Sequence, residues 1–201
     1  MVEARDERDL GRALETALER TLPRGWRATL RAAGAQDIGV DAILDIVSPT
    51  GDRSQACVEF KARAEPAEMY RQLPWLQQCG AALVVARRLS PRTRGILSDG
   101  GISWLEPDGD CRIALGGLFI ERSLGGSRRR EPGAAETRFV ADLFSGGALR
   151  IVRWLLIEPE RPWALSDMAS RAGLTLGFVS RTFKTLARDA YVERARGSTR
   201  L

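Results

Sequence analysis

Histidine is absent from this 201-residue chain, and lysine is nearly absent. Lys61 and Lys184 are the only lysines among its 31 basic side chains, and every other basic position is arginine. Without histidine, the chain cannot use Ser-His-Asp catalysis, histidine-ligated metal nuclease chemistry or zinc fingers that need two histidines. Any catalytic or metal site must therefore be built from carboxylates, lysine, arginine or cysteine.

Cysteine is also scarce, and long apolar runs are missing. Cys57, Cys79 and Cys111 are far apart, odd in number and without CxxC spacing. We expect buried free thiols, as in proteins of a reducing cytoplasm, and neither a disulfide framework nor a zinc site. The charged N-terminal stretch and the lack of any apolar run near 18 residues predict neither a signal peptide nor a membrane span.

Charge is unevenly distributed along the chain. Residues 1–122 contain 17 basic and 18 acidic side chains, whereas residues 146–201 contain 10 basic and 5 acidic ones. The stretch between them, residues 123–145, begins with "SLGGSRRREPG", which is typical of a linker. Its arginine triplet 128–130 suits a phosphate contact or a solvated hinge equally well. We therefore predict an N-terminal domain, a linker, and a basic C-terminal domain suited to nucleic acid.

The pattern of residues 1–122 predicts an α/β domain with a mixed sheet and flanking helices. A helix is expected where Leu10, Leu14, Ala17 and Leu18 share one face. The "SPRT" stretch suggests a helix cap at Ser90, and Pro74 is a candidate interruption of the helix before it. The expected elements are a helix at 5–21, a hairpin at 38–62, a helix at 66–78, a strand at 81–87, a helix from 90 and a hairpin at 102–116.

Two carboxylates and a lysine are expected to converge on the first hairpin. Glu59 and Lys61 share one face of its second strand, and Asp41 and Asp45 share one face of its first strand. If these faces coincide, paired carboxylates would bind a hard cation such as Mg²⁺ or Mn²⁺. Such a metal polarises a phosphodiester and activates water, and a lysine beside it supports the developing charge. Arginine fits that role poorly, because it does not lose its proton and because its bulky fork is badly suited to act as a point charge.

This order of elements resembles the PD-(D/E)xK restriction-endonuclease-like superfamily over roughly residues 5–120. The resemblance implies that Asp41 or Asp45, Glu59 and Lys61 are catalytic, and that Glu15 or Glu19 supplies a further carboxylate from the first helix. Asp41, Asp45 and Glu59 would then hold the metal. Two alternatives remain open: Glu59 and Lys61 form an ordinary exposed pair, or the fold serves for binding without catalysis.

The C-terminal residues predict three helices followed by a strand. In the first, "GGALRIVRWLLIEP", we expect Leu149, Val152, Leu155 and Leu156 to face inward. The second, "ALSDMASRAG", has Ser166 as its candidate cap, and the third is "LGFVSRTFKTLARDA". The strand "YVERAR" follows. This order is similar to a winged helix-turn-helix.

The third helix has two opposite faces. At about 100° per residue, Val179, Phe183 and Leu186 fall within about 60° of one another and are expected to face inward. The opposite face presents Gly177, Arg181, Lys184 and Arg188, which supply three cations and no acid. An amphipathic face in a protein-binding winged helix is the alternative to a DNA interface. The predicted DNA-binding residues are Thr175, Gly177, Ser180, Arg181, Lys184, Arg188, Arg194 and Arg196.

Two classes of function are consistent with this sequence. The first is a cytoplasmic regulator that binds double-stranded DNA, with the N-terminal domain serving dimerisation, sensing or additional DNA contact. The second is a metal-dependent DNA endonuclease that the winged helix targets. The composite resembles bacterial helix-turn-helix proteins with a restriction-like N-terminal domain. A homodimer is expected, since one winged helix covers only a half-site. The ending "GSTRL", inside the expected wing, suits a fragment or a shortened wing.

Overall fold

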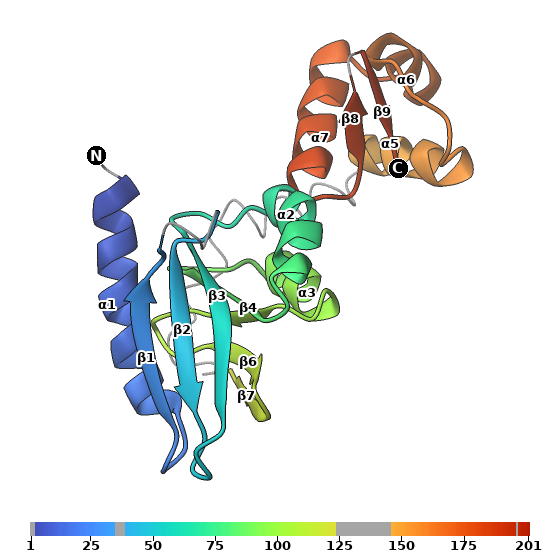
Figure 1. The fold of residues 1–201 in the computed structure, drawn as a ribbon. Helices are drawn as coiled ribbons and strands as arrows, with labels where there is room; N and C mark the ends of the chain where they lie inside the picture. The colour runs from blue at the N-terminus through green and yellow to red at the C-terminus, as the bar shows by residue number, and fades with distance from the viewer. Residues whose placement is uncertain (1–2, 35–38, 124–145, 196) are drawn as a thin grey trace. The chain divides into compact units, whose positions relative to one another are not determined.

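A computed structural model describes residues 3–34, 39–123, 146–195 and 197–201 and divides the chain into two compact units (Figure 1). The first unit is Met1–Leu124 and the second is Gly125–Leu201. Apart from Ser123, the predicted linker, including its arginine triplet, lies outside the described residues. Each unit has its own apolar core.

The first unit contains a mixed sheet of seven strands whose order in the sheet follows their order in the chain. The three central strands β3, β4 and β5 run parallel, and all other neighbours are antiparallel. The strands are β1 (Arg27–Ala32), β2 (Ala42–Val47), β3 (Arg53–Lys61), β4 (Ala82–Ala86), β5 (Ser103–Leu105), β6 (Cys111–Leu115) and β7 (Leu118–Arg122). The α/β class is thus confirmed, and the hairpin predicted at 38–62 is present as β2 and β3.

Helices cover both faces of this sheet. Helix α1 (Glu3–Thr21) buries the predicted stripe of Leu10, Leu14, Ala17 and Leu18 against one face. Helices α2 (Pro66–Gln78) and α3 (Pro91–Asp99) lie on the other side, as Figure 1 shows. Because side chains alternate along a strand, Val58 faces α1, whereas Glu59 and Lys61 face the side of α2.

The structure shows whether Pro74 interrupts α2 and whether Ser90 caps α3. Helix α2 continues through Pro74, which does not interrupt it. Pro74 is on the exposed side, and Tyr70, whose carbonyl loses a helical hydrogen bond to the proline, is also exposed, so water can replace that bond. Helix α3 begins as predicted, because the side chain of Ser90 accepts a hydrogen bond from the backbone N–H of Thr93.

In its described residues, the second unit has three helices and a small hairpin. Between the first two helices, Trp163 pairs with Thr199 through two backbone hydrogen bonds, which adds a third extended segment beside the hairpin. Trp163 is fully buried, and the guanidinium carbon of Arg161 lies 4.2 Å from the centroid of its ring. The elements are α5 (Gly146–Ile157), α6 (Leu165–Ala172), α7 (Leu176–Arg188), β8 (Glu193–Ala195) and β9 (Ser198–Arg200).

Two predictions for the second unit are wrong. Helix α5 buries Ala148, Ile151 and Leu155, whereas Leu149 and Leu156 are 45% and 62% exposed. The helix is apolar on several sides, so periodicity alone does not identify its inner face. Ser166 is not a cap, because Ala164 takes the N-cap position of α6 without a side-chain hydrogen bond. The backbone pairing of Trp163 keeps the chain extended up to that point.

Candidate functional sites

The end of strand β3 holds a partly buried ion pair. The Nζ atom of Lys61 lies 2.7 Å from Oε1 of Glu59, and the side chains are 16% and 11% exposed. Glu68, in the first turn of α2, adds a second carboxylate 3.5 Å from the same Nζ atom. Glu59 and Lys61 therefore do not form the exposed pair that was the alternative interpretation. Lys61 is enclosed by carboxylates from two elements.

Asp41 is the predicted aspartate that joins this cluster. It directly precedes β2, its backbone N–H donates to the carbonyl of Val58, and its Oδ2 atom accepts a hydrogen bond of 2.7 Å from the N–H of Phe60. These two bonds place Asp41 beside Glu59 on the neighbouring strand. The charge of Asp41 also contributes to raising the pKa of Glu59.

Two other predicted site residues lie elsewhere. Asp45 is four residues further along β2, about 13 Å from Asp41 at the usual rise of a strand. Its carboxylate accepts a 2.6 Å hydrogen bond from Gln55 and lies 3.5 Å from Arg31. Glu19, like Glu15, is exposed on α1, and α1 covers the opposite face of the sheet. The structure therefore brings Asp41, Glu59 and Lys61 together and leaves Asp45 and Glu19 outside.

Burial and charge act on this cluster in opposite ways. Burial is the largest effect on Glu59 and raises its pKa, although the hydrogen bond from Lys61 lowers it. Burial also lowers the pKa of Lys61, but the hydrogen bonds and charges of Glu59 and Glu68 outweigh it and raise that pKa above 10.5. Lys61 is consequently an ammonium at neutral pH. It can stabilise negative charge, but it cannot accept a proton as a general base.

The carboxylates offer limited capacity for a metal ion. The Oε2 atom of Glu59 is buried and has no hydrogen-bond partner among the described residues. Mg²⁺ binds through one or two carboxylates plus substrate phosphate and water, so Asp41 and Glu59 would suffice as its protein ligands. In the described parts of the chain, no group of three or more His, Cys, Asp or Glu side chains is arranged to hold a metal. The predicted three-carboxylate set with Asp45 is not assembled.

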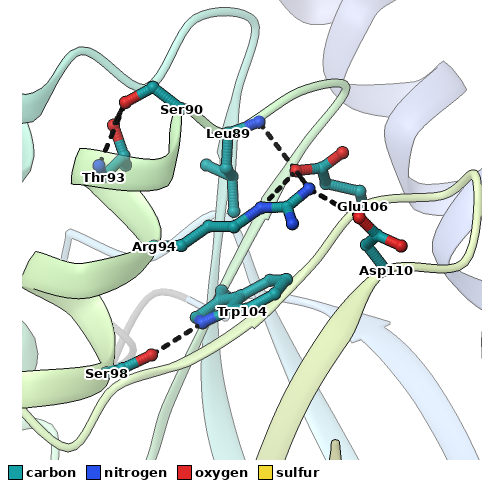
Figure 2. A network of polar contacts seen from close by, with 8 residues as sticks. All are labelled: Leu89, Ser90, Thr93, Arg94, Ser98, Trp104, Glu106 and Asp110. Carbon is teal, nitrogen blue, oxygen red and sulfur yellow. Dashed lines mark hydrogen bonds and ion pairs between the residues drawn. The ribbon is translucent and has the colours of Figure 1, made fainter. Parts of the chain in front are cut away.

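A second polar cluster was not predicted from the sequence (Figure 2). Arg94 on α3 forms ion pairs with Glu106 and, at 2.8 Å, with Asp110, and its guanidinium carbon lies 4.9 Å from the centroid of the Trp104 ring. Glu106 also accepts a hydrogen bond of 2.9 Å from the backbone N–H of Leu89. The cluster fixes the β4–α3 connection to the β5–β6 turn. Its partners are 12 and 16 residues from Arg94, which is beyond the reach of helical or strand periodicity.

Helix α7 displays the predicted cationic face. Val179, Phe183 and Leu186 are buried, as expected, in the core of the second unit. The predicted outward residues, Gly177, Arg181, Lys184 and Arg188, are all exposed. Arg188 donates to the adjacent carboxylate of Asp189 at 3.0 Å.

The other predicted DNA-binding residues surround this face. Thr175 is exposed and caps α7, because its Oγ1 accepts a 3.3 Å hydrogen bond from the N–H of Phe178. Ser180 is half-buried, and Arg194 on β8 is exposed. Arg196 lies outside the described residues.

Comparisons with protein-family models, with curated proteins and with solved structures give no match for this chain. The function is therefore inferred from the residues of this chain alone. In addition, no helix within the described ranges combines the length and the apolar character needed to cross a membrane.

Proposed function

We propose that this protein binds duplex DNA through its second unit and acts as a transcriptional regulator, with the first unit serving dimerisation, sensing or additional DNA contact. The exposed cationic face of α7 carries this proposal. Arg181 and Lys184 are one turn apart on the face opposite the buried Val179 and Phe183. Gly177 on the same face leaves room for the close approach of a phosphate backbone.

The surrounding elements support a winged helix-turn-helix. The second unit has the order helix, extended residue, helix, helix, hairpin, and Gly173 ends α6 in the left-handed conformation (φ 64°) that a tight turn requires. Because the extended residue Trp163 pairs with β9, the hairpin is attached to the helical core. In that fold α7 would enter the major groove, and the hairpin with Arg194 would contact the adjacent backbone.

Charge reversal on α7 tests the proposal. In fluorescence anisotropy with a labelled duplex, Arg181→Glu combined with Lys184→Glu should abolish binding, because the phosphates would then face two carboxylates. Arg12→Glu combined with Arg20→Glu makes the same charge change at exposed positions of α1 and should retain binding. Equal losses in both variants, or binding by the wild type that is independent of salt, would refute DNA binding through α7.

The proposal includes a homodimer, because a single winged helix contacts only one half-site. Sedimentation velocity with and without a two-fold symmetric duplex measures the assembly. A dimer is expected on the duplex, and a monomer under both conditions at high concentration contradicts this part of the proposal.

A metal-dependent endonuclease is the second candidate, and the convergence of Asp41, Glu59 and Lys61 favours it. Asp41 and Glu59 would hold Mg²⁺ or Mn²⁺, which supplies Lewis-acid activation of water and phosphate when bound. Lys61, held as an ammonium, would stabilise charge on the phosphate. Plasmid DNA should be cut with Mg²⁺ or Mn²⁺, not with Ca²⁺ or EDTA, and Lys61→Ala should stop cutting without weakening binding. Intact plasmid under all metal conditions rejects this candidate.

A further inference from the structure

Two arginines lie side by side where the parallel strands β3 and β4 end. Lys61 is paired with Ala86 in the register of these strands, and further along an isolated bridge pairs Ala64 with Leu89. Both pairs have the same offset, so Arg63 lies opposite Arg88 on the neighbouring segment. Both side chains are exposed.

The acids that flank this arginine pair are mostly engaged by other cations. Glu59 and Glu68 form ion pairs with Lys61, while Glu106 and Asp110 form ion pairs with Arg94 (Figure 2). The remaining flanking acids, Glu65 before α2 and Asp108 in the β5–β6 turn, are exposed. Within the described residues, neither Arg63 nor Arg88 takes part in an ion pair.

The backbone around the arginine pair is held by specific hydrogen bonds. The N–H of Leu89 donates to Glu106, and Oγ1 of the buried Thr93 donates to the carbonyl of Ala64 at 2.9 Å. The two arginine Cα atoms therefore stay on adjacent strand ends. Like charges directly opposite each other on neighbouring strands are destabilising, and an anion between them would relieve that repulsion.

We propose that Arg63 and Arg88 form a second phosphate contact for the duplex that α7 binds. This inference rests on the proposed function and assigns DNA contact to the first unit. Two adjacent guanidinium groups suit phosphate oxygens, because each presents a planar set of donors. A duplex bound by the second unit raises the local concentration of phosphate at the first unit, since both units belong to one chain. Because of this raised local concentration, even a weak contact between the arginine pair and a phosphate would be occupied.

The salt dependence of duplex affinity in the full chain tests the proposal. Each phosphate neutralised contributes about 0.9 to the slope of log affinity against log salt, and the two arginines share one phosphate, so Arg63→Ala with Arg88→Ala should reduce the slope by about 0.9. Arg63→Lys with Arg88→Lys keeps both charges and should keep the wild-type slope. The matched control is Arg24→Ala with Arg53→Ala, two exposed arginines at the opposite end of the sheet, which should also keep it.

The outcomes separate this proposal from the proposed function. Wild-type binding with an unchanged slope in the Arg63/Arg88 alanine variant overturns the second contact and leaves DNA binding through α7 intact. The second contact is also overturned if the slope falls equally in the alanine and lysine variants, or equally in the Arg24/Arg53 control. In either case the charge of Arg63 and Arg88 would not be the cause of the change in slope. Failure of the wild-type chain to bind any duplex refutes the proposed function itself. The melting temperature of the Arg63/Arg88 alanine variant should equal or slightly exceed that of the wild type, because it removes the repulsion between the two arginines, and the other variants should match the wild type.

Discussion

The two lysines of this chain occupy opposite environments. Lys61, in the first unit, is 16% exposed and lies within 3.5 Å of two carboxylates on different elements. Lys184, in the second unit, is exposed on a helix face whose other outward residues are Gly177, Arg181 and Arg188. The charge of Lys61 is therefore matched inside the protein, whereas that of Lys184 is presented to the surroundings.

The same contrast holds between Arg94 of the first unit and Arg181 and Arg194 of the second. Arg94 in the first unit is bound by Glu106 and Asp110. Burial lowers the pKa of Arg94, but the hydrogen bonds and charges of these two acids outweigh burial and raise that pKa overall. In the second unit, Arg181 and Arg194 are exposed, and the net charge of residues 146–201 is +5. Cations matched by internal acids stabilise a fold or a site, whereas unmatched cations on one face attract a polyanion.

The largest expected effects test whether the two units are independent. Phe183 is fully buried in the core of the second unit and Leu83 in that of the first. Phe183→Ala should destabilise the second unit by about 3–5 kcal/mol, and Leu83→Ala should destabilise the first by about 2–5 kcal/mol. Calorimetry should show one transition shifted in each variant, and duplex binding should be lost only with Phe183→Ala. A single transition shifted equally by both variants would mean that the chain unfolds as one body.

A smaller loss of stability is expected when Lys61, whose charge is matched by carboxylates of the first unit, is removed. Loss of an exposed ion pair costs about 0–1 kcal/mol, and removal of one partner of a fully buried pair costs about 3–5 kcal/mol. Because the pair of Lys61 and Glu59 is partly buried, Lys61→Ala should destabilise the first unit by an amount between these two ranges. The variant leaves Glu59 buried beside Asp41 and Glu68 without its partner. Denaturant unfolding at neutral pH measures the change. Lys61→Arg should retain part of the stability, since it keeps the charge.

The pH dependence of the free energy of unfolding tests whether Glu59 is the buried carboxylate that Lys61 stabilises. Its pKa is raised above 4.5 on folding, mainly by burial, so the folded state binds more protons in the window just above that value. The free energy of unfolding therefore falls as pH rises from 4.5 through the raised pKa. Lys61→Ala removes a group that lowers this pKa and should extend the fall to higher pH, whereas Glu59→Gln should abolish it. The same pH profile in wild type and Glu59→Gln contradicts the assignment.

Helix caps provide the smallest stability effect. Thr175 caps α7 through its hydroxyl, whereas Ser166 makes no cap hydrogen bond in α6. Thr175→Ala should therefore cost about 1 kcal/mol, and Ser166→Ala should leave stability within about 0.5 kcal/mol of the wild type. The melting temperature of the second unit reports both. A larger loss with Ser166→Ala would restore the cap position predicted from the sequence.

Local patterns predicted the elements whose signals lie within a few residues. The α1 stripe, the β2–β3 hairpin, the Ser90 cap and the inward face of α7 follow from periodicity and capping. Strand β1 was missed because the edge strand "RATLRA" has Arg27, Thr29 and Arg31 on one face and buries little. Strand β7 was missed because the two-glycine turn before it looked like the end of a hairpin.

The candidate sites were predictable only in part. Spacing placed Glu59 and Lys61 on one face, but it could not choose between Asp41 and Asp45, since that choice depends on the cross-strand register. Glu68 was missed because an acid in the first turn of a helix is ordinarily explained by the helix dipole. The Arg94 cluster joins residues that are distant in sequence, and no local pattern marks it.

Duplex affinity as a function of salt, measured on Lys184→Ala and Lys61→Ala in parallel, tests the central contrast most directly. Lys184→Ala should lower the slope of log affinity against log salt by about 0.9, because it removes one unmatched cation from the proposed DNA-binding face of α7. Lys61→Ala should leave that slope at the wild-type value, since Glu59 and Glu68 already neutralise its ammonium. An unchanged slope in Lys184→Ala together with a reduced slope in Lys61→Ala would contradict the account.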